Sequence, residues 1–173
     1  MKSILISSLC AALLSPAMVF AADGTINFTG SVIAATCTYT AAGKSQSVAL
    51  PAVSASALSG PANTTTAGDT AFNVELDSCN APKSVAIRLE GGAFDIATGN
   101  LKNTATTGAA GGVMVQLFDR NTNTPFQVSG TTAAVQSSAD GKAVIPLLAK
   151  YVATGTVSAG SVTSSVNFSI IYP

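Results

Sequence analysis

The sequence has no histidine and no tryptophan, and only 9% of its 173 residues are charged. Without histidine, the usual general base for a serine or cysteine nucleophile is missing, and so is the commonest neutral metal ligand. Glu75 and Asp77 are the closest pair of carboxylates, and we interpret them as solvated residues at a strand edge. We therefore expect no enzyme, no cofactor and no metal site.

Charge of one sign is also scarce. Eight Lys and Arg residues balance eight Asp and Glu residues, so the formal net charge is 0. No basic cluster of the kind that attracts nucleic acid or anionic lipid occurs. The composition argues against both as partners. It suits a chain that packs against copies of itself or lies outside the cell.

The chain has one long apolar run, and it lies near the start. A short basic start, Met1-Lys2, precedes the apolar residues 4–14, which are too few to span a bilayer. Pro16 breaks the run, and small residues precede a cut after Ala21. We predict that residues 1–21 are a secretory signal peptide. The remaining 22–173 suit one domain with a hydrophobic core.

Cysteine is rare, with three residues in all, and Cys10 leaves with the signal peptide. Cys37 and Cys79 remain, and two cysteines in an exported chain most simply pair. A disulfide that closes such a loop stabilises the fold by roughly 4 kcal/mol in the chain-entropy description. We predict a Cys37–Cys79 disulfide.

No stretch shows convincing helical periodicity, although we expect one helical turn at Ala55–Leu58. Short alternating segments between Gly, Ser, Thr and Asn loops predict a β-sandwich or barrel. The expected strands cover residues 25–38, 46–50, 70–76, 84–89, 113–118, 142–153 and 160–173. Within 142–153, Pro146 predicts a sheet edge or a bulge.

The last expected strand has one apolar side that nothing in its own pattern covers. That side consists of Val162, Val166, Phe168, Ile170 and Tyr172. A strand added alongside would bury these side chains and satisfy the backbone groups of an exposed edge.

The first expected strand has a matching apolar side, which comprises Ile26, Phe28 and Val32, with Gly30 in the same alternation. Four residues, 33–36, separate this strand from Cys37 and span at most about 13–14 Å. With so short a linker, the first strand could turn back to lie beside the last strand of its own chain only with difficulty. We therefore expect it to reach a neighbouring molecule.

Several segments, in this order, resemble those of chaperone–usher pilins of the type 1 fimbrial major-subunit kind. They are "GTINFTGSVIAATC", "LDSC" around Cys79, "GVMVQLFDRN", "IPLLAKYVATG" and the closing strand. Gly160 is fourteenth from the end and Tyr172 is penultimate, as in the terminal pattern of that family. The final Pro173 departs from the pattern but lies beyond the alternation.

The resemblance implies an all-β, incomplete immunoglobulin-like sandwich that a donor strand from another subunit completes. It implies a signal peptide at 1–21, a donor extension at 22–34 and a pilin domain at 35–173. The donor residues are then Ile26, Phe28, Gly30 and Val32, and the acceptor groove comprises Gly160, Val162, Val166, Phe168, Ile170 and Tyr172.

The resemblance also implies partners and a location. Other copies of the chain or sibling pilins, a periplasmic chaperone and an outer-membrane usher are the expected partners. The product is a structural subunit that polymerises by donor-strand exchange into an extracellular adhesive fimbrium, reached through the periplasm. Two alternatives stay open: a minor or adaptor fimbrial subunit, and, more remotely, a secreted carbohydrate-binding β-sandwich. No residue pattern identifies a host receptor.

Overall fold

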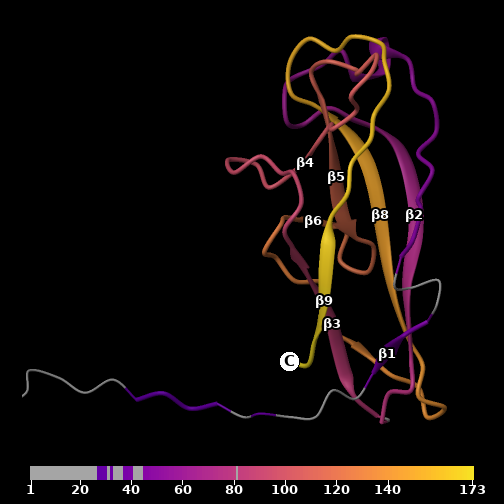
Figure 1. Ribbon diagram of the computed structural model, residues 1–173, viewed down its shortest axis with the longest axis vertical. Helices are drawn as coiled ribbons and strands as arrows, with labels where there is room; N and C mark the ends of the chain where they lie inside the picture. Colours follow the sequence, from indigo (N-terminus) through magenta and orange to yellow (C-terminus); the bar gives the residue numbers. More distant parts are fainter. Residues whose placement is uncertain (1–26, 31, 33–36, 41–44, 81) are drawn as a thin grey trace, which may run out of the picture. The chain divides into compact units, whose positions relative to one another are not determined.

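The computed structural model describes residues 27–30, 32, 37–40, 45–80 and 82–173 (Figure 1). The chain divides into two units, Met1–Ile33 and Ala34–Pro173, and each is described by itself. In the first unit, the described residues 27–30 and 32 belong to no strand. Of the rest of the expected strand at 25–38, Cys37 and Thr38 are described, and Thr38 begins the short strand β1 (Thr38–Tyr39).

In the second unit, a large antiparallel sheet has the order β1-β2-β8-β5-β4, and β6 pairs with the free end of β5. Its strands are β1 (Thr38–Tyr39), β2 (Thr66–Asp77), β4 (Leu101–Lys102), β5 (Val113–Asp119), β6 (Thr124–Phe126) and β8 (Ala143–Ala153). The central pair, β2 and β8, runs in continuous register from Thr70↔Ala149 to Leu76↔Ala143. β1 is therefore one edge of this sheet.

A smaller antiparallel sheet has the order β7-β3-β9. Its strands are β3 (Ser84–Glu90), β7 (Val135–Gln136) and β9 (Asn167–Ile171). Among the described residues, no strand pairs with the outer side of β9, so this strand is a sheet edge.

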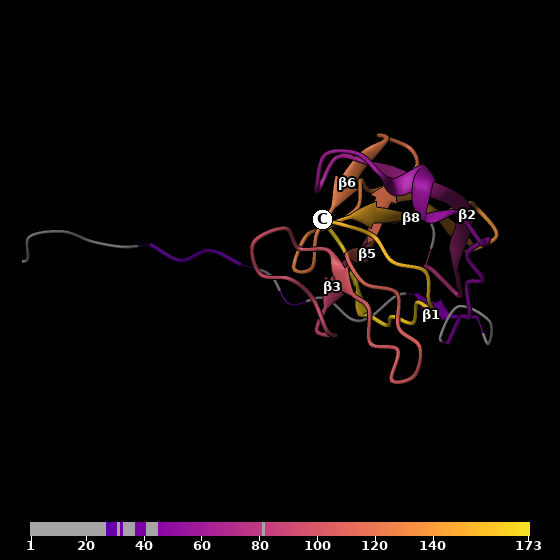
Figure 2. The same cartoon turned by 90° about the horizontal axis from the view of Figure 1, so that it is seen from above.

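The core lies between the two sheets because alternate residues of each long strand point inward. In β5 and β8 the buried and partly exposed residues alternate along most of the strand. Viewed from above in Figure 2, β2 and β8 lie apart from β3. The largest fully buried side chains come from both sheets: Leu76, Val85, Ile87, Ile145, Leu147 and Val152.

The expected helical turn at Ala55–Leu58 is confirmed as a 3-10 helix, η1. Ser54 caps it, since its hydroxyl accepts a hydrogen bond from the Ala57 N–H at 3.3 Å. Leu58 is buried and anchors the turn to the core. No strand forms at 46–50, where one was expected. No helix in the described part of the chain is long and apolar enough to cross a membrane.

The prediction for Pro146 is wrong, because Pro146 lies in the central strand β8 and the β2–β8 register shift falls elsewhere, between Ala67 and Thr70. The Pro146 carbonyl accepts from the Arg120 N–H at 3.1 Å, so its backbone faces the β5 side. The β5–β8 ladder ends one step earlier, at Asp119↔Leu147. The missing proline N–H therefore falls where no partner strand needs it.

Candidate strand-accepting site between β1 and β9

The disulfide between Cys37 and Cys79 is present, and both residues are buried. It joins the residue before β1 to the turn that follows β2. The β1–β2 pairing, Thr38↔Asp77 and Tyr39↔Leu76, lies directly beside it. The disulfide thus fixes the position of β1 at the edge of the large sheet, although β1 is only two residues long.

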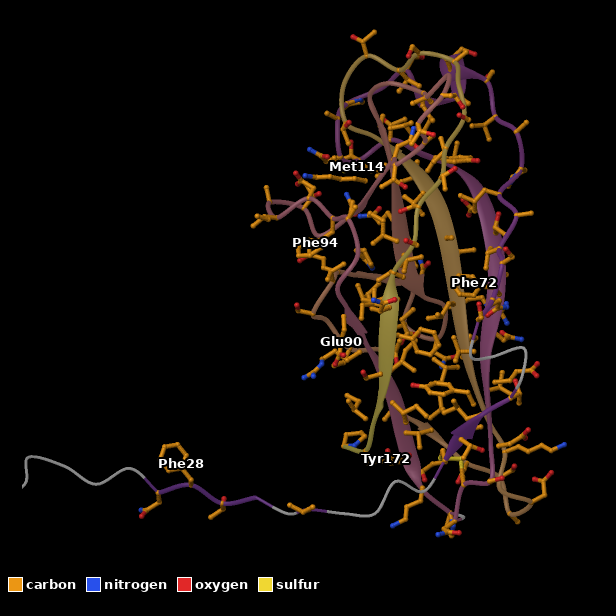
Figure 3. All side chains as sticks on the ribbon, viewed as in Figure 1. Phe28, Phe72, Glu90, Phe94, Met114 and Tyr172 are labelled. Atoms are coloured by element: carbon orange, nitrogen blue, oxygen red, sulfur yellow. A yellow bond between two sulfur atoms is a disulfide. The ribbon has the colours of Figure 1, made fainter. Side chains whose placement is uncertain are left out.

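The apolar side of the chain's end faces the core, as its alternation predicts. Outward residues from Ser161 to Asn167 are exposed, and the residues between them are half-buried. Five of the predicted acceptor residues pack against the main core cluster without being fully covered: Val162, Val166, Phe168, Ile170 and Tyr172. Figure 3 shows Tyr172 near the end of β9, and Phe72 on β2.

The hydrogen bonds of β3 show which backbone groups of β9 face outward. Ile87 and Leu89 direct their backbone groups to the 129–132 segment, away from β9: the Leu89 N–H donates to Gly130 O at 3.1 Å, and Ile87 O accepts from the Thr132 N–H at 3.0 Å. In an antiparallel ladder, the residues opposite them are then non-hydrogen-bonded pairs. Those residues are Phe168 and Ile170, so their N–H and C=O groups point away from β3.

The edge of β1 faces outward in the same way. The Thr40 N–H donates to Glu75 O at 3.4 Å, so Thr40 and Thr38 direct their backbone groups toward β2. Cys37 and Tyr39 alternate with them and direct theirs away from β2. We call the strip between these two outward edges the β1–β9 gap: Cys37 and Tyr39 on one side, Phe168 and Ile170 on the other.

Two tyrosines lie across the β1–β9 gap. The Tyr172 hydroxyl accepts a hydrogen bond from the Cys37 N–H at 2.9 Å. The Tyr39 ring meets the Phe168 ring edge-on, with centroids 5.4 Å apart and planes at 85°. Burial raises the pKa of Tyr39, and a hydrogen bond from the Ile170 backbone opposes that shift. The two sheet edges are therefore close neighbours without a shared backbone ladder.

Gly160 and the residues after it do not continue β9, although one strand was expected over 160–173. Ser161 instead forms a parallel bridge with Ala109. The Asn103 side chain holds this segment: its Nδ2 donates to Ser161 O at 2.9 Å and its Oδ1 accepts from the Thr163 N–H at 3.0 Å. A Cβ on Gly160 would collide with the backbone of residues 108–110, so the close approach requires glycine.

The outer face of β9 is fixed to β3 by a polar cluster. Ser169 Oγ donates to Glu90 Oε2 at 2.7 Å, and Arg88 pairs with Glu90 Oε1 at 2.8 Å. The Arg88 side chain, and after it the Ser169 hydroxyl, hold the pKa of Glu90 below its usual value. Sequence reasoning missed this cluster, although the spacing of Arg88 and Glu90 on one strand face was a signal. It missed Asn103 as well, for which no local pattern exists.

The predicted donor residues belong to the first unit. Phe28 and Val32 are almost fully exposed, at 90% and 103% relative accessibility. No atom lies within 4 Å of the place where a Cβ on Gly30 would stand. Ile26 lies outside the described residues. The donor role of these residues stays a prediction.

A two-layer β-sandwich with an uncompleted edge is the incomplete immunoglobulin-like fold of pilins. Comparisons of the chain with known proteins identify the same class. The family model described as "Fimbrial protein" matches residues 26–173. The major fimbrial subunit SMF-1 of Stenotrophomonas maltophilia (strain K279a) is 37% identical over 166 residues, which cover 91% of this chain and 97% of that protein.

Solved structures agree with the sequence comparisons. A Burkholderia pseudomallei antigen and type I fimbria protein has a TM-score of 0.57 and 34% identity over 86% of this chain and 97% of its own. A subunit of a chaperone–usher pilus, solved in a study of rod uncoiling, has a TM-score of 0.61 over 88% of this chain and 96% of its own. Its 19% identity supports the fold alone.

The chain belongs to the fimbrial protein family and is a structural fimbrial subunit, a pilin. Subunits of this class are not enzymes; they polymerise with other pilins and are exported to the cell surface as pili. Donor-strand exchange is typical of the fold.

Proposed function

We propose that the β1–β9 gap accepts residues 22–34 of another copy of this chain or of a sibling pilin, and that repetition of this step builds the fibre. The proposal rests on two features that the same residues of β9 combine. Phe168 and Ile170 present half-buried apolar side chains and outward backbone groups at once. An added strand satisfies both, because strand addition supplies a ladder and side-chain burial together.

The donor segment has the complementary character. Phe28 and Val32 are exposed apolar side chains, which a soluble protein covers when it can. With Ile26 they would supply three apolar side chains on one side of a two-residue alternation, in which Gly30 takes the remaining position. Each contributes about 1.5–3 kcal/mol on full burial. Gly30, which lacks a side chain, suits a position where the donor backbone comes close to the acceptor.

The geometry of this contact is head-to-tail. One end of a molecule donates and a different edge accepts, so the interface is heterologous and gives an open filament. Each subunit that fills a neighbour's gap still has its own gap to be filled. The shaft of an extracellular fimbrium needs both properties in every subunit.

Export precedes assembly in this account. Residues 1–21 serve as the signal peptide, and residues 22–173 enter the periplasm, where the Cys37–Cys79 disulfide forms. A periplasmic chaperone covers the exposed edge of β9 until an outer-membrane usher brings the next subunit. Both partners are those that the resemblance to chaperone–usher pilins implies, and the edge described above would give them a physical task.

A pair of substitutions in the donor segment tests the proposal. Phe28→Asp places a charge on the apolar side of the segment, whereas Thr29→Asp places the same charge on the alternate side. We expect Phe28→Asp subunits to form no fibre, because none of them can donate to a neighbour, and Thr29→Asp subunits to assemble. Electron microscopy of cells that express each variant alone measures this. Fibres of normal length from Phe28→Asp cells would refute the donor assignment.

A further inference from the structure

Two tyrosines, one from each sheet edge, reach across the β1–β9 gap. Tyr172, which follows β9, accepts from the Cys37 N–H on the β1 side at 2.9 Å. Tyr39, in β1, packs its ring edge-on against Phe168 in β9, with centroids 5.4 Å apart, and the nearby Ile170 backbone opposes the rise in the pKa of its hydroxyl. Each tyrosine thus belongs to one sheet edge and contacts the other edge.

The N–H groups of Cys37 and Ile170, which lie near these two hydroxyls, are those that a strand added between β1 and β9 needs. Cys37 directs its backbone away from β2, and Ile170 directs its backbone away from β3. An incoming strand would offer carbonyl oxygens to the same two donors. A single N–H makes one strong hydrogen bond, so the tyrosine oxygens and the carbonyls of the new strand compete for it.

The Tyr39 ring has a separate role at the same place. Its edge contacts the Phe168 ring at a centroid distance of 5.4 Å, so it covers part of the apolar side that the donor would cover. Phenylalanine in place of tyrosine retains such a ring contact and removes only the hydroxyl. The two contributions are therefore separable by substitution.

We propose that Tyr39 and Tyr172 form a clasp that closes the β1–β9 gap in the unoccupied subunit, and that opening of this clasp limits the rate at which a donor strand enters. The clasp rests on the proposed function, since it concerns the same gap. It protects two edge N–H groups from unspecific strand pairing before the correct donor arrives. It also gives the subunit a barrier to premature polymerisation that lies within its own fold.

The test measures entry of a labelled synthetic peptide with the sequence of residues 22–34. The acceptor is the chain 22–173 carrying Phe28→Asp, so that copies do not fill one another. Tyr39→Phe and Tyr172→Phe are each added to this background. We expect peptide association about two- to tenfold faster in each, the factor that loss of one net hydrogen bond from the starting state corresponds to. Stopped-flow fluorescence anisotropy gives the rates.

Tyr151→Phe is the matched control, because Tyr151 is the third tyrosine of the chain and lies in β8, away from β9 in the sheet order. It should leave the association rate unchanged. Peptide binding with equal rates in all variants would overturn the clasp and leave the proposed function intact. Failure of the peptide to bind any variant, the background protein included, would overturn the proposed function and the clasp with it.

Amide hydrogen exchange supplies a readout that loss of general stability does not imitate. In the unoccupied chain, Tyr39→Phe should speed exchange at the Ile170 amide and leave the Cys37 amide protected. Tyr172→Phe should produce the opposite pattern. Exchange that rises equally at both amides in both variants would show global loosening and contradict the reciprocal clasp.

Discussion

The substitution Phe168→Asp tests whether the apolar side of β9 receives a strand. In the unoccupied chain Phe168 is half-buried, so an aspartate there retains access to water and folding is only modestly affected. Strand addition changes this, because it removes the side chain from solvent. The substitution should therefore weaken assembly much more than it weakens the fold.

The magnitude follows from two contributions. Covering the remaining half of a phenylalanine side chain stabilises the complex by about 1 kcal/mol, and aspartate forfeits this. A carboxyl that enters an apolar site must first take up a proton, which costs about 4 kcal/mol at pH 7 for an ordinary pKa near 3.9. The sum of about 5 kcal/mol corresponds to a loss of three to four powers of ten in affinity.

Fluorescence anisotropy with the peptide of residues 22–34 measures this loss, and thermal unfolding monitored by circular dichroism checks the fold. Ser165→Asp is the matched control, because Ser165 is exposed on the alternate side of the same segment. It should change peptide affinity less than tenfold. If Phe168→Asp bound the peptide as tightly as Ser165→Asp, the reasoning about this side of β9 would be wrong.

Three further predictions concern the frame around the gap. Gly160→Ala should destabilise the fold by about 1–3 kcal/mol, since the new Cβ meets the backbone of residues 108–110; thermal unfolding should show a melting temperature several degrees lower. Asp119→Asn should cost about 1.5–3 kcal/mol in urea unfolding, because the buried carboxylate accepts backbone hydrogen bonds, among them one at 2.6 Å; an unchanged midpoint would contradict that role. Burial raises the pKa of both Tyr39 and Tyr151 above 10.0, so the folded state holds these protons more tightly than the unfolded state. The free energy of unfolding should therefore fall as pH rises above 10, and the fall should be smaller in Tyr39→Phe.

The long strands could be predicted from sequence because burial on one face imposes a two-residue alternation. β3 and β5 agree with their expected positions within one residue at each end, since turn residues bound them. β2 begins four residues earlier than expected, at Thr66, because its pairing with β8 extends past the alternating stretch. The disulfide was predictable from export and from the number of cysteines.

Other features depend on where distant segments return, and local patterns do not encode that. The 160–166 segment alternates like a strand, yet its backbone partners come from a loop held by the Asn103 side chain. Pro146 lies in a central strand because β5 happens to end beside it. The hydroxyl contacts of Tyr39 and Tyr172 form only once the two sheets are packed together.

The most direct test of the account is an electron cryomicroscopy map of the assembled fibre at side-chain resolution. We predict a continuous strand between β1 and β9 of every internal subunit, formed by residues 22–34 and connected to Cys37 of the adjacent subunit. A map in which each subunit completes this strip with its own chain, or in which residues 22–34 lie elsewhere, would contradict the account.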